Sequence, residues 1–210
     1  MINKTTLMGI YPICQDYICS DIIYLTKIEE VISSGIKVLQ IRYKNVSARK
    51  KRYLLITIHR LCIDNNVLLI INDDYHAIKY IDGCGLHLGN NDISISRARK
   101  IFGSDIVIGK SCYGSIEDAK TEEKNGASYI SFGAMYKSQT KKNALTFNHE
   151  IITEAKKVIN IPICVIGGIN KSNLMHVIEY KPDMISMVSG IFKYDNPGRE
   201  IKKMMELMSK

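Results

Sequence analysis

The sequence predicts an α/β protein, a single-domain (β/α)8 TIM barrel over residues 1–210. Short runs rich in β-branched residues alternate with longer amphipathic stretches, as strands and helices do in βα units. Strict alternation implies right-handed crossovers and a parallel sheet. Eight such units suit a chain of 210 residues that closes into a barrel, with an open doubly wound sheet as the alternative.

The expected strands are the short apolar runs. They lie near residues 7–14, 38–43, 67–72, 84–89, 106–111, 128–134, 162–167 and 184–189. The runs 67–71 and 106–108 are apolar on both faces, as parallel strands covered by helices must be. Pro12 lies within the first run and has no backbone donor, so we expect an irregularity there.

The expected helices lie near residues 21–34, 47–64, 75–81, 94–102, 115–125, 148–159, 171–180 and 198–208. Ser115 and Asp118 have the spacing of a capping box, and Ser94 can cap the fourth helix. Gly126 follows the fifth helix where a left-handed residue belongs. The chain shows no domain linker, low-complexity segment or obvious repeat.

Composition is that of an ordinary globular protein, with 46% hydrophobic and 24% charged residues. No apolar run approaches the roughly 20 residues that span a membrane, and residues 1–14 do not have the pattern of a signal peptide. The six cysteines form no Cys-x-x-Cys pair, so we expect reduced, mostly buried thiols and no zinc. We therefore expect a cytoplasmic protein.

The net charge of +8 allows two interpretations. A basic surface can bind nucleic acid, or basic groups can gather around phosphorylated substrates. Apart from the block 49–52, the lysines and arginines are spread along the chain, so charge alone does not decide between the two.

The second strand ends in a polar face. The active site of a (β/α)8 barrel lies at the C-terminal ends of its strands. Alternation places Gln40, Arg42 and Lys44 on one face, which points into the barrel when the apolar face meets the helices. Two cations beside an amide make an anion clamp. The alternative is that Lys44 only reaches solvent.

Acidic residues follow the third and fourth strands. Asn72, Asp73 and Asp74 end the third strand, and Asp92 follows the fourth. Carboxylates at adjacent strand ends can share Mg²⁺ with substrate phosphates. Asn and Asp also favour turns, which is the alternative explanation.

The last three strands offer groups for a phosphate. The loop after the sixth strand, 133–143, carries Ser138, Thr140, Lys141 and Lys142, and long loops of this kind are usually functional. Alternatively it is a mobile basic loop. Glycines 167 and 168 after the seventh strand, and Ser189 and Gly190 after the eighth, occur where barrels commonly bind phosphate.

Two further motifs have simpler explanations. His87 shares the inward face of the fourth strand with Gly85 and Gly89, and a hydrogen-bonded core histidine is favoured over a catalytic one. The tripeptide 109–111 resembles the end of a P-loop, but Ser104 stands where a P-loop needs glycine. Because no Ser-His-Asp or Cys-His pattern occurs at the strand ends, a covalent nucleophile is not favoured. These residues indicate a Mg²⁺-assisted barrel enzyme for phosphorylated substrates.

The polar motifs together form an ordered set. They are Gln40-x-Arg42-x-Lys44, Asn72-Asp73, Gly85-x-His87-x-Gly89-x-x-Asp92, Gly109-x-Ser111, Ser138-x-Thr140-Lys141-Lys142, Ile166-Gly-Gly-Ile169 and Val188-Ser189. The set resembles the thiamine phosphate synthase family over essentially the whole chain. The resemblance implies a transferase that condenses hydroxymethylpyrimidine diphosphate with hydroxyethylthiazole phosphate, through a pyrimidine cation, to thiamine phosphate and diphosphate.

The resemblance also implies roles for individual residues. Asp73 and Asp92 would hold the cofactor Mg²⁺ on the diphosphate. The substrate-binding residues it implies are Arg42, Lys44, Asn72 and Lys141 for the diphosphate, Gln40 and Ser111 for the pyrimidine or diphosphate, and Thr140, Gly168, Val188, Ser189 and nearby Ser138 for the thiazole phosphate. Among these, Arg42, Lys44, Lys141 and Ser111 form the implied catalytic set.

The chain departs from the family pattern in places. Ala134, Lys137 and Ser138 stand where the sixth-strand loop usually has prolines and related residues, and Lys110 replaces a small apolar residue. Pro12 and Gln15 alter the first strand. These departures concern the shape of the loop after the sixth strand and the rate of catalysis more than the class of reaction.

Two other functions remain open. A thiazole tautomerase-like paralogue shares the Gly-Gly phosphate site but has no need of the diphosphate and magnesium residues. A non-catalytic barrel could bind thiamine precursors or RNA. A nucleic-acid binder should show a continuous basic stripe with exposed aromatic residues, whereas the charge here is scattered and tryptophan is absent.

Overall fold

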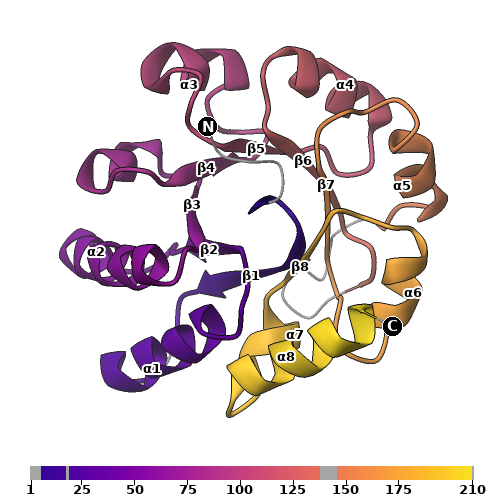
Figure 1. Cartoon of the computed structure of the whole chain (residues 1–210). Helices are drawn as coiled ribbons and strands as arrows, with labels where there is room; N and C mark the ends of the chain where they lie inside the picture. Colours follow the sequence, from indigo (N-terminus) through magenta and orange to yellow (C-terminus); the bar gives the residue numbers. More distant parts are fainter. Residues whose placement is uncertain (1–5, 18, 138–145, 210) are drawn as a thin grey trace.

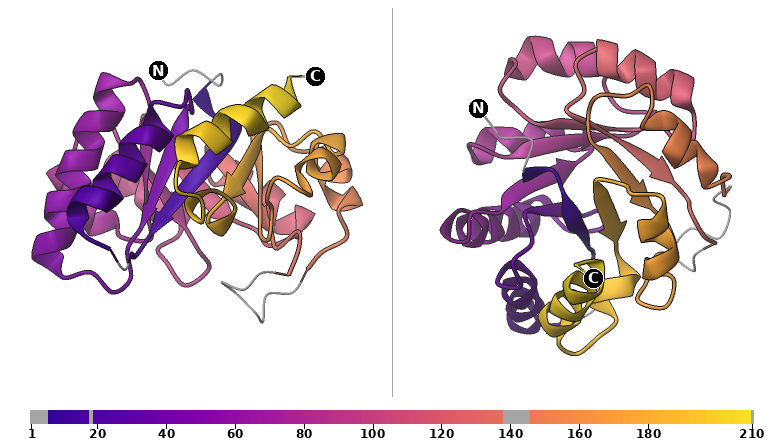
Figure 2. Two further views of the ribbon diagram at one scale, coloured as in Figure 1. Left: turned by 90° about the horizontal axis from the view of Figure 1, so that it is seen from below. Right: turned by 45° about the vertical axis from the view of Figure 1, so that its right-hand side comes forward.

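The computed structural model of the chain describes residues 6–17, 19–137 and 146–209. Eight parallel strands close into a barrel in the order β1-β2-β3-β4-β5-β6-β7-β8. Figure 1 views the ring of strands face-on and shows the helices outside it. Figure 2 shows this inner layer of strands and outer layer of helices from two other directions. The predicted (β/α)8 barrel is confirmed, and the open doubly wound sheet is excluded.

The strands begin and end close to the predicted runs. They are β1 (Gly9–Gln15), β2 (Val38–Arg42), β3 (Leu68–Asn72), β4 (Gly85–Leu88), β5 (Ile108–Ser111), β6 (Tyr129–Gly133), β7 (Ile163–Ile166) and β8 (Met184–Met187).

The helices of the described residues form the outer layer. They are α1 (Asp21–Ile32), α2 (Ala48–Asp64), the 3₁₀ helix η2 (Tyr75–Tyr80), α3 (Ile95–Phe102), α4 (Ile116–Lys124), α5 (Glu150–Ala155), α6 (Leu174–Glu179), α7 (Ser189–Phe192) and α8 (Pro197–Met208).

Four elements differ from the sequence prediction. The segment expected as a helix at 75–81 is the 3₁₀ helix η2, in which no side chain caps the first turn. The eighth strand ends at Met187 rather than at residue 189, because the backbone turns at Val188 and the short helix α7 begins at Ser189. Helices α5 and α6 each have six residues and are shorter than expected.

Side chains of the strands separate into two apolar layers. The barrel interior contains Leu7, Tyr11, Val38, Leu68, Ile70, Val107, Tyr129, Cys164 and Met184. The opposite faces of the strands, such as Leu39 and Ile41 of β2, pack against the helices in a larger cluster. This alternation confirms that Val38 and Gln40 point inward while Leu39 and Ile41 point outward.

Pro12 does not interrupt β1, so the irregularity expected there is not found. The strand pairs with β8 from Gly9 to Pro12 and with β2 from Ile13 to Gln15. The proline therefore lies where the pairing of β1 passes from β8 to β2, and the strand continues through it.

The predicted helix caps are present. The Ser115 hydroxyl accepts a hydrogen bond from the Asp118 amide at 3.1 Å, and the Ser94 hydroxyl accepts one from the Arg97 amide at 3.2 Å. Gly126 has φ +95° after α4, a backbone conformation that favours glycine. These local signals position α3 and α4 against the barrel.

Arg99 ties together the end of the barrel where the strands begin. Its Nε donates to the Gly126 carbonyl at 2.9 Å, and its Nη2 donates to the Ser128 hydroxyl at 2.9 Å. Its Nη1 donates to carbonyls that follow α3, of which Ile106 is the nearest at 2.6 Å. One guanidinium thus joins the segments before β5 and β6.

All six cysteines lie within the described ranges and are free thiols, five of them buried and Cys19 exposed. This agrees with the predicted reduced state. Among the helices of the described residues, none combines the length and apolar character that crossing a membrane requires.

Candidate active site

A chain of polar side chains crosses the barrel interior. Gln40 Nε2 donates to the Tyr11 hydroxyl at 2.7 Å, and the Tyr11 and Tyr129 hydroxyls are 2.9 Å apart. The Tyr129 hydroxyl lies 2.9 Å from His87 Nδ1, and His87 Nε2 lies 3.0 Å from Ser111 Oγ. Two residues predicted to contact substrate, Gln40 and Ser111, are therefore connected through three buried side chains.

Glycines on β5 and β4 make room for this chain and for the apolar side chains around it. A Cβ atom on Gly109 would overlap the ring of Tyr129, and one on Gly85 would overlap Ile70. Burial raises the pKa of Tyr129 well above its usual value, so the phenol stays protonated and can donate one hydrogen bond. The favoured interpretation of His87 as a hydrogen-bonded core histidine agrees with its burial and with its contacts to Tyr129 and Ser111.

Lys44 and Asp73 meet at the mouth of the barrel. Lys44 Nζ lies 2.6 Å from Asp73 Oδ2, so Lys44 does not simply extend into solvent. Asp73 has φ +63°, a left-handed conformation that aspartate tolerates and that turns the chain directly after β3. The turn is fixed by a hydrogen bond of 2.9 Å from the Asp73 amide to the His87 carbonyl.

Asp92 lies beside Asp73, and the two carboxyl groups affect each other. Burial raises the pKa of Asp92, the Gly89 amide opposes this, and Asp73 raises it further. Burial also acts to raise the pKa of Asp73, but hydrogen bonds from Lys44 and Asp92 outweigh it and the net pKa is lowered. Two carboxyl groups in contact at adjacent strand ends form an oxygen donor pair whose repulsion a divalent cation relieves.

This donor pair fits Mg²⁺. In the described ranges no group of three or more His, Cys, Asp and Glu side chains could surround a metal by itself. Mg²⁺ does not require such a cage, because it usually takes one or two carboxylates, several waters and substrate phosphates. Asp73 and Asp92 are the residues that would hold it.

Arg42 and Asn72 are the last residues of β2 and β3. Both side chains are partly exposed, and the Arg42 charge contributes to the lowered pKa of Asp73. In the register of β3 and β4, Asn72 pairs with His87. The structure thus brings Arg42, Lys44, Asn72, Asp73 and Asp92 to the same end of three adjacent strands.

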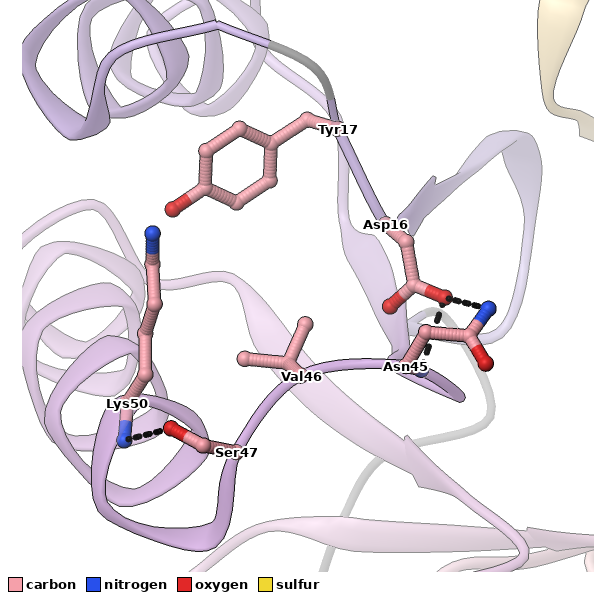
Figure 3. Close-up of a pocket in the computed structure, with 6 residues that line it drawn as sticks. All are labelled: Asp16, Tyr17, Asn45, Val46, Ser47 and Lys50. Atoms are coloured by element: carbon pink, nitrogen blue, oxygen red, sulfur yellow. Dashed lines mark hydrogen bonds between the residues drawn. The ribbon is translucent and has the colours of Figure 1, made fainter.

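Asp16, which the sequence analysis did not single out, orders the loop after β2. Its carboxylate accepts hydrogen bonds from the backbone amides of Lys44 at 3.0 Å and Asn45 at 3.0 Å. Figure 3 shows Asp16 and Asn45 at one side of a cavity of about 440 Å³ whose other side is formed by Tyr17 and Lys50. The only signal in the sequence is an aspartate directly after the first strand. Its contact with the backbone amides of the loop after β2 appears in the structure.

The loops after β6 and β7 are joined by backbone hydrogen bonds. The Met135 amide donates to the Ile166 carbonyl and the Tyr136 amide to the Gly167 carbonyl, each at 3.0 Å. Gly168 has φ +64°, and a Cβ there would lie 2.7 Å from Tyr136 Cβ. Only glycine allows this close approach.

The predicted phosphate residues of β7 and β8 lie close together. A Cβ on Gly190 would overlap the Ile169 carbonyl oxygen, so the start of α7 packs directly on the loop after β7. Gly168, Val188 and Ser189 thus belong to the loops after β7 and β8, beside a short extra helix, where barrel enzymes commonly bind phosphate. Ser138, Thr140, Lys141 and Lys142 lie outside the described residues.

Comparison with known proteins gives the family. Residues 10–191 match the family described as thiamine monophosphate synthase. The chain belongs to this family. A thiamine-phosphate synthase of Thioalkalivibrio sulfidiphilus is 33% identical over 199 residues, 94% of each chain. One of Nitrosomonas eutropha is 39% identical over 162 residues, which cover 77% of this chain and 76% of the other.

A solved structure of the thiamine monophosphate synthase family has the same fold. The thiamine phosphate pyrophosphorylase of Pyrococcus furiosus superposes with a TM-score of 0.86 at 25% identity, and the match covers 98% of this chain and 97% of that one. The resemblance inferred from the ordered motifs is therefore confirmed.

Proposed function

We propose that this protein is a thiamine phosphate synthase, a transferase that joins hydroxymethylpyrimidine diphosphate to hydroxyethylthiazole phosphate. Membership of the thiamine monophosphate synthase family supports the class of reaction. The observation that carries the proposal is the meeting of Lys44, Asp73 and Asp92 at the mouth of the barrel, directly above the buried polar chain.

The reaction needs a leaving group and a nucleophile, and both are in the substrates. The bond between the pyrimidine methylene carbon and the diphosphate oxygen breaks, and its electron pair leaves with the diphosphate. The lone pair of the thiazole ring nitrogen then forms the new carbon–nitrogen bond. No proton has to be removed, which agrees with the absence of a catalytic triad in the sequence.

The cations at the mouth stabilise the charge that develops on the diphosphate. Arg42 and Lys44 stand at the end of β2, and Lys141 is proposed to join them from the loop after β6. Positive groups placed in advance around a developing negative charge lower the barrier most when water is excluded. Asn72 would add an amide donor from β3.

Asp73 and Asp92 are the residues proposed to hold Mg²⁺ at the mouth of the barrel. When bound, it would neutralise part of the leaving group's charge. Lys44 already contacts Asp73, so the metal, the ammonium group and the diphosphate would share one cluster of charges.

The interior chain would receive the pyrimidine. Gln40 and Ser111 present an amide and a hydroxyl, and both are held by the buried hydrogen bonds behind them. The thiazole phosphate is proposed to lie at Gly168, Val188 and Ser189, with Ser138 and Thr140 beside it. We place the reaction in the cytoplasm, in keeping with free cysteines.

The test is to incubate the purified protein with both phosphorylated precursors, with and without Mg²⁺, and to measure thiamine phosphate by chromatography. Magnesium-dependent product is expected, with one diphosphate released per product. The Asp92→Ala variant serves as the control for a contaminating enzyme. Absence of product from folded protein overturns the proposal, and thiazole tautomerisation and then binding of thiamine precursors are measured next.

A further inference from the structure

Lys110 is a buried cation outside the barrel interior. Its neighbours Gly109 and Ser111 face inward, so alternation along β5 directs Lys110 toward the helices. The residue is 6% exposed, although most positions of this kind are apolar. A lysine in such a place requires partners for its charge.

The nearest partner of Lys110 is a backbone carbonyl at the end of β4. Lys110 Nζ donates to the Gly89 carbonyl at 2.9 Å. The Glu122 carboxylate of α4 lies 4.0 Å away, at the limit of an ion pair, so it compensates the charge without a short hydrogen bond. A hydrogen bond from a charged donor is roughly twice as strong as a neutral one.

Gly89 in turn holds the carboxylate of Asp92. The Gly89 amide donates to Asp92 Oδ2 at 2.7 Å, and the Asp92 amide approaches the Gly89 carbonyl at 3.4 Å. The second contact is long, so Lys110 is the stronger partner of that carbonyl. The turn from Gly89 to Asp92 is therefore fixed on one side by the carboxylate and on the other by the ammonium group.

We propose that Lys110 is a positioning residue for Asp92: its ammonium group holds Gly89, and Gly89 orients the carboxylate that binds the divalent cation. The inference rests on the proposed function, because it takes Asp92 as a ligand of Mg²⁺. It gives a purpose to one departure from the family pattern, the lysine at a position that is usually small and apolar.

The inference concerns metal affinity, so the first measurement is metal binding without turnover. Manganese alone is titrated into the full-length protein, and free Mn²⁺ is followed by electron paramagnetic resonance. Lys110→Met keeps the length of the side chain and removes the donor. Because groups that orient metal ligands typically contribute 10–100-fold to affinity, Lys110→Met should bind Mn²⁺ at least about tenfold more weakly.

Matched variants separate positioning from a general loss of stability. Glu122→Gln leaves the hydrogen bond to Gly89 in place and should keep the Mn²⁺ affinity. Lys120→Met removes an exposed lysine of α4 and should also keep it. Lys110→Arg retains a donor and should restore most of the affinity lost in Lys110→Met. If Lys110→Met does not fold, Lys110→Met with Glu122→Gln removes both charges and is measured instead.

Turnover supplies the second measurement. In Lys110→Met the Mg²⁺ concentration at half-maximal rate should rise about tenfold, while the KM for the thiazole phosphate stays unchanged. Equal Mn²⁺ affinity in Lys110→Met and the natural protein overturns the inference even if thiamine phosphate is formed. Failure of the natural protein to bind Mn²⁺ also overturns it. Conversely, Mn²⁺ binding that depends on Lys110 without any product contradicts only the proposed function.

Discussion

The hydroxyl of Tyr129 lies 2.9 Å from Nδ1 of His87, in the interior of the barrel. The same hydroxyl lies 2.9 Å from that of Tyr11. One phenol therefore connects the β2 side of the site, through Tyr11 and Gln40, with the β5 side, through His87 and Ser111.

Tyr129→Phe should remove this connection, because the Tyr11 hydroxyl and the His87 ring each lose their contact with the phenol. The free energy of unfolding should fall by about 1–3 kcal/mol, the usual cost of unpaired buried polar groups. The KM for the pyrimidine diphosphate should rise several-fold, because the phenol no longer orients His87, the side chain that contacts Ser111. Urea denaturation and steady-state kinetics check both effects, with exposed Tyr53→Phe as the control. Unchanged stability would show that the hydroxyl contributes nothing.

Asp92→Ala and Lys141→Ala should each lower turnover by about a hundredfold or more, as loss of charge stabilisation at a leaving group does. Both should keep the thermal unfolding temperature within a few degrees, since Asp92 belongs to neither apolar cluster and lysine is rarely a core residue. Asp64→Ala, an exposed carboxylate at the end of α2, should keep full activity. Near-normal turnover of either folded variant contradicts the site assignment.

Gly109→Ala should destabilise the barrel, because the added methyl group would overlap the Tyr129 ring. Overpacking of this kind costs about 1–3 kcal/mol. Combination with Tyr129→Ala removes the overlapping ring, so the two effects should be clearly less than additive in a double-mutant cycle. Additive losses would mean that the two residues do not share the space.

Arg99→Met should lower the free energy of unfolding by about 3 kcal/mol, because several hydrogen bonds from one partly buried cation are lost. Arg99 lies at the end of the barrel opposite the active site, so kcat and KM below the unfolding temperature should not change. Arg97→Met, an exposed change on the same helix, should have no effect on either quantity. A change in KM with unchanged stability would contradict this assignment.

The buried thiols should make stability fall at alkaline pH. Burial raises the pKa of Cys84 to about 11 and the pKa of Cys62 and Cys112 to about 12. The folded protein therefore keeps protons that the unfolded chain releases near pH 9. The contribution of these thiols to the free energy of unfolding is complete below that pH. It decreases as the pH rises toward 11, by at most about 1.4 kcal/mol per pH unit for each thiol.

Urea denaturation between pH 8 and 11 measures this slope. Cys62→Ala should reduce the slope, whereas Cys19→Ala, which changes an exposed thiol, should leave it unchanged. An identical slope in Cys62→Ala would show that the Cys62 thiol does not titrate differently in the two states.

Periodicity and local signals predicted the barrel and the positions of several candidate site residues. The inward direction of Gln40 and Arg42 follows from a period of two residues, and the ends of α4 follow from Ser115 and Gly126. Carboxylates at adjacent strand ends also meet as predicted, because parallel strands end at one edge. These features depend only on neighbouring residues and on the topology.

Features that depend on distances across the barrel could not be predicted from periodicity or from local signals. Nothing in the sequence indicates that Tyr11 and Tyr129, 118 residues apart, share a hydrogen bond. Alternation gives the direction of Lys110 but not its contact with Gly89. The short helix α7 has too few residues for a periodic pattern to appear.

The glycine on β5 and the tyrosine on β6 constrain how the sequence can change over time. Because Tyr129 fills the space that a side chain at Gly109 would need, a larger residue on β5 fits without loss of stability only when the residue on β6 is smaller. When the residue on β6 changes first, the overlap with a new side chain at position 109 is avoided. A lineage that keeps the tyrosine is therefore expected to keep the glycine as well.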